Sequence, residues 1–242
     1  METPDVTWPP APNWRSWRHV TKLDPDRPVT PGLLDAVYAS GTDAIVVGGS
    51  TGMTQGAVFD LLSRLMDAPV PVALEVSTLE SAMPGAGLFF IPLVLNTRDA
   101  GWMGGAQVGA LSKILPVLGP IIPWHLLVPE AYLVLNQNST VARLTGADTA
   151  LDAATAAAYA AFAGRVLRLP LIYVEYSGAF GDMELLRAVC ENAGDAHVVY
   201  GGGIGSGEQA AMAGALAGTV VVGNLVYTDP GRLRETVTAI KP

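Results

Sequence analysis

Eight short apolar runs recur along the chain, and their regular spacing constrains the fold more than any other feature of the sequence. They occupy residues 18–23, 43–49, 70–77, 87–96, 131–136, 170–178, 196–203 and 218–224. The runs are continuously apolar rather than alternating, which is typical of parallel strands buried on both faces. Helical patterns separate them, so that a strand and a helix repeat about every 28 residues. This repeat predicts an α/β fold, a TIM (β/α)8 barrel.

The same pattern predicts the domain organisation. We expect a single barrel domain over residues 17–242, preceded by a Pro-rich extension over residues 1–16 that carries no periodicity. A doubly wound sheet fits less well, because polar and Gly-rich motifs follow almost every strand rather than one switch point. The segment between the fourth and fifth runs is long and broken by Gly and Pro, so we expect it to be irregular.

Charge and cysteine content exclude several classes of function. The net charge of −8 disfavours nucleic acid as a partner. A single cysteine, Cys190, excludes an intrachain disulfide and a Cys-rich metal site and fits a reducing cytoplasm. The sequence shows no signal peptide, and it lacks the run of about 18 apolar residues that a membrane span needs. We therefore expect a cytoplasmic protein. Hydrophobic residues make up 50% of the chain. A large core explains this content, and an apolar groove that binds a lipid is the more specific alternative explanation.

Glycine-rich motifs follow three of the strands, at the end of the barrel where active sites of this fold lie. The sequence YGGGIGSGEQ at 200–209 leads from a strand into a helix, and VGN at 222–224 ends the last strand. Successive glycines let backbone N–H groups converge on an anion at a helix start. These two loops therefore predict a phosphate site, against the plainer alternative of tight turns. The third motif, GGSTGMT at 48–54, either binds a second phosphate or caps a helix with Ser50 or Thr51.

Charged residues end two strands at the same end of the barrel: Lys22 and Asp24 the first, and Glu175 the sixth. Mg²⁺ bound by Asp24 and substrate phosphates would explain an acid at a phosphate-rich mouth; otherwise Asp24 opens the turn DPDRP. Glu175 either meets ligand hydroxyls or takes a proton, or it pairs with Lys22 or an arginine. Strand alternation places Tyr173 on the face of Glu175 and Tyr176 on the opposite face.

Taken in order, several motifs resemble the geranylgeranylglyceryl phosphate synthase family, which includes the bacterial heptaprenylglyceryl phosphate synthases. They are WRHVTKLDP, SGTDAIVVGGSTGMT, LEVS, FFIPLVLN, YVEYSGAFGD, YGGGI and VVVGN. The resemblance extends from about Trp17 to Val226, nearly the whole chain. It implies a TIM barrel in which an irregular region replaces one helix, and it also implies a homodimer.

The resemblance further implies a Mg²⁺-dependent prenyltransferase that forms an ether between a prenyl diphosphate and sn-glycerol-1-phosphate and releases diphosphate. The prenyl diphosphate would bind Mg²⁺ near Asp24, helped by Ser50 or Thr51. Its tail would follow an apolar groove in the barrel. The small residues Gly109 and Ala110, in the segment after GAQ, would leave room for a long tail.

The acceptor would occupy the other half of the site. The resemblance implies that its phosphate lies on the two glycine loops, with these residues: Ser177, Gly202, Gly203, Gly223 and Asn224. Its hydroxyls would meet Tyr173 and Glu175, with Lys22 nearby. Glu175 would orient or deprotonate the attacking hydroxyl, and Tyr173 would shield the allylic carbon.

Three alternatives stay open. The chain has Ala131, Gln137 and Thr21 where the family commonly has Gly, Pro and an aromatic residue. These departures leave room for a related branch that transfers farnesyl to 3-phosphoglycerate in phosphoglycolipid antibiotic biosynthesis. A phosphosugar isomerase or aldolase-like barrel would need Lys22 as its base or Schiff-base lysine. A non-catalytic phosphoprenyl-binding protein would bind both ligands without turnover.

Overall fold

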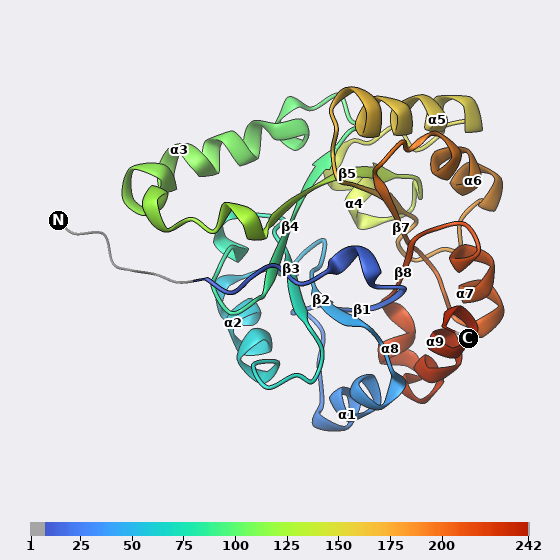
Figure 1. Ribbon diagram of the computed structural model, residues 1–242, viewed down its shortest axis with the longest axis horizontal. Helices are drawn as coiled ribbons and strands as arrows, with labels where there is room; N and C mark the ends of the chain where they lie inside the picture. The colour runs from blue at the N-terminus through green and yellow to red at the C-terminus, as the bar shows by residue number, and fades with distance from the viewer. Residues whose placement is uncertain (1–7, 242) are drawn as a thin grey trace.

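The computed structural model describes residues 8–241 and forms a closed barrel of eight parallel strands (Figure 1). Each strand pairs with the next along the chain, and the last closes the barrel on the first. The strands are β1 (His19–Leu23), β2 (Ala44–Val47), β3 (Val72–Glu75), β4 (Leu88–Val94), β5 (Leu127–Val134), β6 (Leu171–Glu175), β7 (His197–Gly201) and β8 (Thr219–Val222). The predicted TIM barrel is therefore confirmed.

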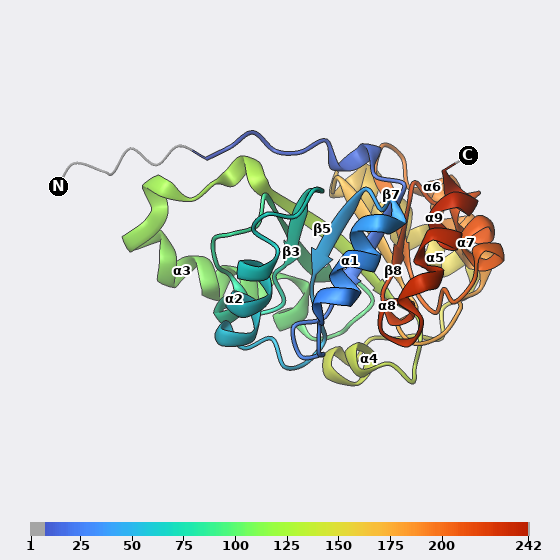
Figure 2. The same ribbon diagram turned by 90° about the horizontal axis from the view of Figure 1, so that it is seen from below.

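Helices cover the outside of the barrel (Figure 2). They are α1 (Pro31–Ser40), α2 (Gln55–Arg64), α4 (Thr140–Thr145), α5 (Ala153–Ala161), α6 (Met183–Asn192), α7 (Gly207–Gly214), α8 (Asn224–Thr228) and α9 (Leu233–Ile240). Their starts follow from the sequence: Thr30 accepts a hydrogen bond from an N–H of the first turn of α1, and Pro31 occupies its first position. Among residues 8–241, no helix combines the length and apolar character needed to cross a bilayer.

The chain around β4 departs from the regular repeat. Only a 3₁₀ turn at Leu79–Ser81 connects β3 to β4, so the ring lacks a helix there. After β4 a π-helical turn, Gly101–Gly105, kinks at Gly104 and leads into α3 (Ala106–Leu118), which contains Pro116. This helix projects away from the barrel in both views, and none of its residues is buried (Figures 1 and 2). The irregular segment after β4 is confirmed, but the helix that the barrel lacks is the one between β3 and β4.

The fifth strand begins earlier than predicted. Its apolar run was expected at 131–136, whereas the strand spans Leu127–Val134. Pro129 and Glu130 break the apolar pattern, because Pro cannot donate to a strand ladder and a carboxylate is costly to bury. The closed barrel nevertheless pairs Pro129 with Ile91 and turns Glu130 into its interior. The early start of β5 therefore brings an additional carboxyl group into the barrel.

The barrel is closed at the N-terminal ends of the strands by part of the predicted extension. A 3₁₀ turn at Trp14–Ser16 places the Trp14 ring edge-on to Phe90, with 6.2 Å between ring centroids. Trp17 packs on the same phenylalanine at 6.4 Å. Trp14 of the predicted extension thus packs against the barrel core, while residues 1–7 of that extension and Pro242 of the predicted domain lie outside the described residues.

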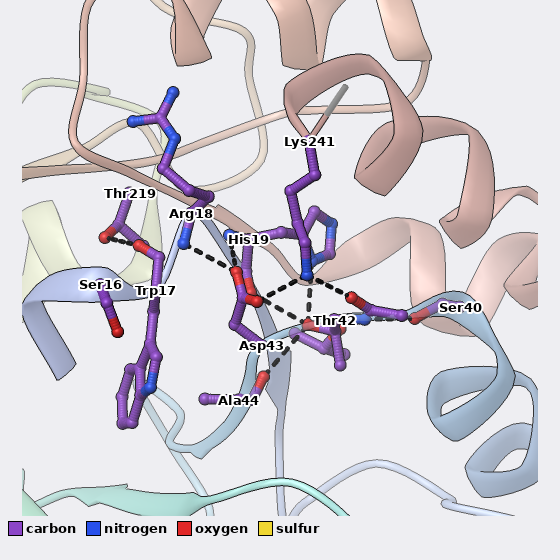
Figure 3. A network of polar contacts seen from close by, with 12 residues as sticks. Ser16, Trp17, Arg18, His19, Ser40, Thr42, Asp43, Ala44, Thr219 and Lys241 are labelled. Atoms are coloured by element: carbon purple, nitrogen blue, oxygen red, sulfur yellow. Dashed lines mark hydrogen bonds and ion pairs between the residues drawn. The ribbon is translucent and has the colours of Figure 1, made fainter. Parts of the chain in front are cut away.

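A buried polar network ties the start of β1 to the end of the chain (Figure 3). The His19 ring contacts the hydroxyls of Thr42 at 2.9 Å and Thr236 at 3.0 Å. Asp43 accepts the backbone N–H of His19 at 3.0 Å and pairs with Lys241 at 2.6 Å. Both ring nitrogens of His19 are engaged far from the strand ends that carry the Gly-rich loops, so this histidine has a structural role.

Burial of His19 predicts a loss of stability in mild acid. Burial lowers the pKa of His19 to about 4 from the model-peptide value of 6.5. A histidine with a depressed folded-state pKa contributes stability that is present above pH 6.5 and is lost as the pH falls towards 4. Its contribution to the free energy of unfolding should therefore drop by about 2 kcal/mol between pH 7 and pH 5. Urea unfolding at both pH values measures this drop.

The His19→Asn variant provides the control. It lacks the titrating ring, so its drop between pH 7 and pH 5 should be smaller than that of the wild type. The remaining drop would come from other groups such as His197, whose pKa burial also lowers to about 4. Equal drops in the two proteins would contradict the assignment to His19.

Candidate active site

A pocket with a volume of about 120 Å³ opens at the C-terminal ends of the strands. It lies where the sequence predicts the site. The predicted residues that line it are Lys22, Asp24, Ser50, Tyr173, Glu175, Ser177, Gly202, Gly203, Gly223 and Asn224. Thr51, Gly109 and Ala110, although within the described chain, are not part of its lining.

Three glutamates and one lysine lie together at the inner end of this pocket and in the barrel interior next to it. Lys22 Nζ contacts both carboxylate oxygens of Glu75, at 2.9 and 3.0 Å. Glu130 and Glu175 complete the group, and each of the three glutamate residues is at most 6% exposed. The predicted alternative of a Lys22–Glu175 pair is therefore replaced by a Lys22–Glu75 pair. With three acids and one base, the group is overall acidic unless some carboxyl groups hold protons.

Lys22 is held in its charged form. Burial alone would lower the pKa of Lys22, but the carboxylates of Glu75 and Glu175 outweigh burial and raise it to about 12. A Schiff-base or proton-abstracting lysine needs the opposite shift, towards neutral pH. The isomerase and aldolase-like alternatives required Lys22 as a base or Schiff-base lysine, and its ion pair with Glu75 disfavours both roles.

Glu175 is positioned by Tyr132, which itself packs on Tyr173. The hydroxyl of Tyr132 donates a hydrogen bond of 2.7 Å to Glu175 Oε2. The Tyr132 ring stacks on Tyr173, with 4.7 Å between centroids and 14° between planes. Tyr173 and Glu175 both face the pocket, while Tyr176 packs in the outer core, as strand alternation predicted. Burial raises the pKa of Glu175, and the Lys22 charge and the Tyr132 hydrogen bond oppose this effect.

Glu130 has no such partner. Its Oε2 is buried without a hydrogen bond among the described residues, and the side chain lines a second cavity deeper in the barrel. This cavity has a volume of about 20 Å³, which is enough for a single water molecule. Burial and the neighbouring Glu75 carboxylate raise the pKa of Glu130 well above the usual range. The raised pKa favours the neutral form of Glu130, which limits the excess of negative charge in the barrel.

The glycine loops after β7 and β8 offer backbone donors. Gly203 has a left-handed φ of 54°, and a Cβ here would collide with the backbone of the loop after β6. Within the described chain, the N–H groups of Gly202, Gly203 and Gly223 donate to no backbone acceptor. Close packing thus explains why glycine is needed, and the unpaired donors at the pocket wall additionally fit an anion.

The loop after β2 wraps around the acids that follow β1. Asp24 Oδ1 accepts the N–H of Asp26 at 2.9 Å, which is the turn that DPDRP predicted. A Cβ at Gly49 would lie 2.6 Å from the same oxygen, so only glycine permits this approach. Ser50 reaches the pocket wall, whereas the helix cap of α2 is Thr54. Burial raises the pKa of Asp24.

Two residues at the pocket wall escaped the sequence reasoning. The guanidinium of Arg27 lies 3.6 Å from the ring centroid of Tyr227, and Arg27 Nη1 donates to Asn224 Oδ1 at 3.1 Å. The hydroxyl of Tyr227 accepts the N–H of Asp24 at 2.7 Å. Arg27 stands in the motif DPDRP, in which only Asp24 was given a role, and Tyr227 is separated from it by most of the chain. No local pattern links them.

The residues predicted for the prenyl groove lie elsewhere. Gly109 and Ala110 are on α3, which projects from the barrel. The neighbouring apolar side chains of this segment are exposed: Met103, Val108, Leu115, Val117 and Leu118. The structure therefore does not bring the predicted groove residues to the pocket.

Known proteins resemble this chain in both sequence and fold. Residues 12–241 match the model of the PcrB family. The chain belongs to this family. The heptaprenylglyceryl phosphate synthase of Brevibacillus brevis is 44% identical over 229 residues, which cover 95% of this chain and 97% of that protein. The geranylgeranylglyceryl phosphate synthase of Methanoculleus marisnigri is 41% identical over 232 residues, covering 95% and 99%. The family resemblance expected from the sequence is thus confirmed, and with it an enzyme of the prenyltransferase class.

A solved structure supports the same relationship. It is the (S)-3-O-geranylgeranylglyceryl phosphate synthase of Thermoplasma acidophilum in complex with its substrate sn-glycerol-1-phosphate. The two folds agree with a TM-score of 0.78 at 27% identity, over 93% of this chain and 94% of that one. PcrB family membership and barrel geometry therefore agree.

Proposed function

We propose that this PcrB family protein transfers a prenyl group from a prenyl diphosphate to the terminal hydroxyl of sn-glycerol-1-phosphate. The observation that carries the proposal is the placement of Glu175. Its carboxyl group lines the pocket below the loops that bear Gly203 and Gly223, and Tyr132 fixes its orientation. A phosphate on those loops would leave the hydroxyl end of a three-carbon ligand facing Glu175. The names of the relatives and of the solved structure support the same acceptor.

The reaction then proceeds by proton removal and substitution. Glu175 accepts the proton of the attacking hydroxyl, whose oxygen forms a bond to C1 of the prenyl group. The bond between C1 and the diphosphate oxygen breaks, and diphosphate leaves with the bonding electrons. Burial raises the pKa of Glu175, and the charge of Lys22 opposes this rise, which favours the ionised form that can act as a base. The Tyr173 ring beside Glu175 shields the allylic carbon with its π face.

Mg²⁺ fits the donor side of this site as an ion that arrives with the substrate. Within residues 8–241 no cluster of three His, Cys, Asp or Glu side chains could hold a metal alone. Mg²⁺ commonly binds through one or two carboxylates and completes its shell with substrate phosphates and water. Asp24 would supply that carboxylate at the pocket wall. When bound, Mg²⁺ would neutralise charge on the diphosphate leaving group.

The charge of the barrel interior favours glycerol phosphate over 3-phosphoglycerate. An acceptor with its phosphate on the glycine loops presents its other end to Glu175, with Glu75 and Glu130 below it. Hydroxyl groups can donate to the Glu175 carboxyl group, whereas a substrate carboxylate would be repelled by its negative charge.

An acceptor comparison tests the proposal. The protein is incubated with Mg²⁺ and farnesyl, geranylgeranyl or heptaprenyl diphosphate, and with each acceptor in turn, and the lipid products are identified by mass. We expect a prenyl ether of glycerol phosphate and at least about tenfold less product from 3-phosphoglycerate, equivalent to about 1.4 kcal/mol. Preferred reaction with 3-phosphoglycerate would contradict the acceptor assignment. Absence of product with every pair, despite ligand binding, would favour the non-catalytic alternative.

A further inference from the structure

Among the described residues that line the pocket, the cationic side chains are Lys22 and Arg27. Lys22 is neutralised by its bidentate contact with Glu75. Arg27 takes no part in the ion pairs of the described chain, which join Lys22 to Glu75, Arg232 to Glu235 and Lys241 to Asp43. Arg27 is therefore the pocket cation whose charge is still available to an anionic ligand.

The guanidinium of Arg27 is held in a defined place. It lies on the Tyr227 ring at 3.6 Å, and the Tyr227 hydroxyl is itself fixed by the N–H of Asp24 at 2.7 Å. Arg27 Nη1 donates to Asn224 Oδ1 at 3.1 Å, which uses one of its five N–H donors. A stacked, preorganised guanidinium loses little conformational entropy when it binds a phosphate. The arrangement thus resembles a built anion site more than a solvated surface arginine.

Asn224 indicates which phosphate this cation serves. Asn224 is the first residue of α8 and directly follows Gly223, at which the proposed function places the acceptor phosphate. Because its Oδ1 accepts from Arg27, its amide NH2 group is left as a donor for a ligand. The Arg27 side chain bonds Asn224 directly, whereas it is linked to Asp24, which the proposed function assigns to the donor side, through the Tyr227 ring. Arg27 therefore both orients Asn224 and adds positive charge beside it.

We propose that Arg27 binds the phosphate of the acceptor, together with Asn224 and the unpaired N–H groups of the glycine loops. The inference rests on the proposed function, since it assigns a residue to the acceptor half of that site. Backbone donors alone are neutral, and a charge-assisted, forked contact to phosphate is about twice as strong as a neutral hydrogen bond. Arg27 supplies that contact, and affinity for the acceptor depends on it.

The test measures acceptor binding without turnover. Calorimetric titration with sn-glycerol-1-phosphate, in the absence of prenyl diphosphate, compares the wild type with Arg27→Gln, Arg27→Lys and Arg187→Gln. Arg187 is an exposed arginine on α6 and serves as the charge-matched control. We expect Kd to rise about 10- to 100-fold in Arg27→Gln, from the loss of a charged hydrogen bond. Arg27→Lys should recover part of the loss, and Arg187→Gln should bind like the wild type.

Steady-state kinetics separate the two halves of the site. The KM for the acceptor should rise in Arg27→Gln while the KM for the prenyl diphosphate changes little. An unchanged Kd for sn-glycerol-1-phosphate, or a rise confined to the prenyl diphosphate KM, would overturn the proposal. If Arg27→Gln fails to fold, Arg27→Lys provides the test. It keeps the positive charge but loses the forked guanidinium contact, so its Kd for sn-glycerol-1-phosphate should still exceed that of the wild type. A wild type that makes no prenyl ether would refute the proposed function, whereas an active wild type with an unaffected Arg27→Gln would refute only this inference.

Discussion

Replacing Glu175 with Gln is expected to reduce turnover by about 10²- to 10⁴-fold, the usual contribution of a positioned general base. The amide can still accept the hydrogen bond that Tyr132 donates to Glu175, so the fold should be retained. It cannot take a proton from the acceptor hydroxyl. Product formation under saturating substrates measures the loss, and unfolding in urea checks the stability of the variant.

The matched control is Glu130→Gln. Glu130 is also a buried barrel glutamate, but it lines the deeper cavity, and burial and Glu75 raise its pKa well above the usual range. Gln has the shape of the protonated acid, so turnover should stay within about threefold of the wild type, a change below about 1 kcal/mol. A Glu175→Gln variant as active as Glu130→Gln would remove Glu175 from the mechanism.

Replacing Lys22 with Met is expected to destabilise the protein by about 3–5 kcal/mol, because removal of one partner leaves a buried charge uncompensated. Lys22 contacts both carboxylate oxygens of Glu75, and its charge also stabilises the ionised form of Glu175. Without the lysine, the barrel would hold three carboxyl groups and no cation. Urea unfolding at pH 7 measures the change in the free energy of unfolding.

A second substitution tests the cause of that loss. The double variant Lys22→Met/Glu75→Gln removes the stranded charge and should recover most of the stability. Lys113→Met is the control: the same substitution on the exposed face of α3, expected to change stability by less than about 0.5 kcal/mol. Equal stability of the single and double variants would show that Glu75 is not the group that Lys22 compensates.

The barrel and its mouth were predictable because their signals are local. Strands buried on both faces read as continuous apolar runs, and a residue at a strand end, such as Glu175, can be assigned to the mouth once the fold is known. The glycine loops can also be recognised in the sequence, since Gly203 needs a left-handed φ that other residues avoid. Alternation then placed Tyr173 beside Glu175.

The partners inside the barrel were not predictable in the same way. Lys22 and Glu75 are separated by 53 residues, and register between neighbouring strands brings them together. Glu130 was not predicted as a residue of the barrel interior, because Pro129 and Glu130 interrupt the apolar pattern by which the start of β5 would be recognised. A carboxyl group in an apolar run looks unfavourable until three-dimensional packing supplies the lysine that compensates it.

The remaining gaps concern contacts between distant loops. Arg27 meets Asn224 and Tyr227 only after the barrel closes β8 against β1. The course of α3 is likewise set by the kink at Gly104 and by its few contacts with the barrel. The sequence predicted an irregular segment here, but it could not give the direction in which α3 projects.

The central claim is that the acceptor hydroxyl held at Glu175 attacks C1 of the prenyl group. Labelling tests it most directly: sn-glycerol-1-phosphate with oxygen-18 in its terminal hydroxyl is incubated with Mg²⁺ and an unlabelled prenyl diphosphate. Mass spectrometry then locates the label in the lipid and in the released diphosphate. The mechanism predicts oxygen-18 in the ether of the lipid and none in diphosphate. A lipid without the label, or no lipid product at all, would contradict it.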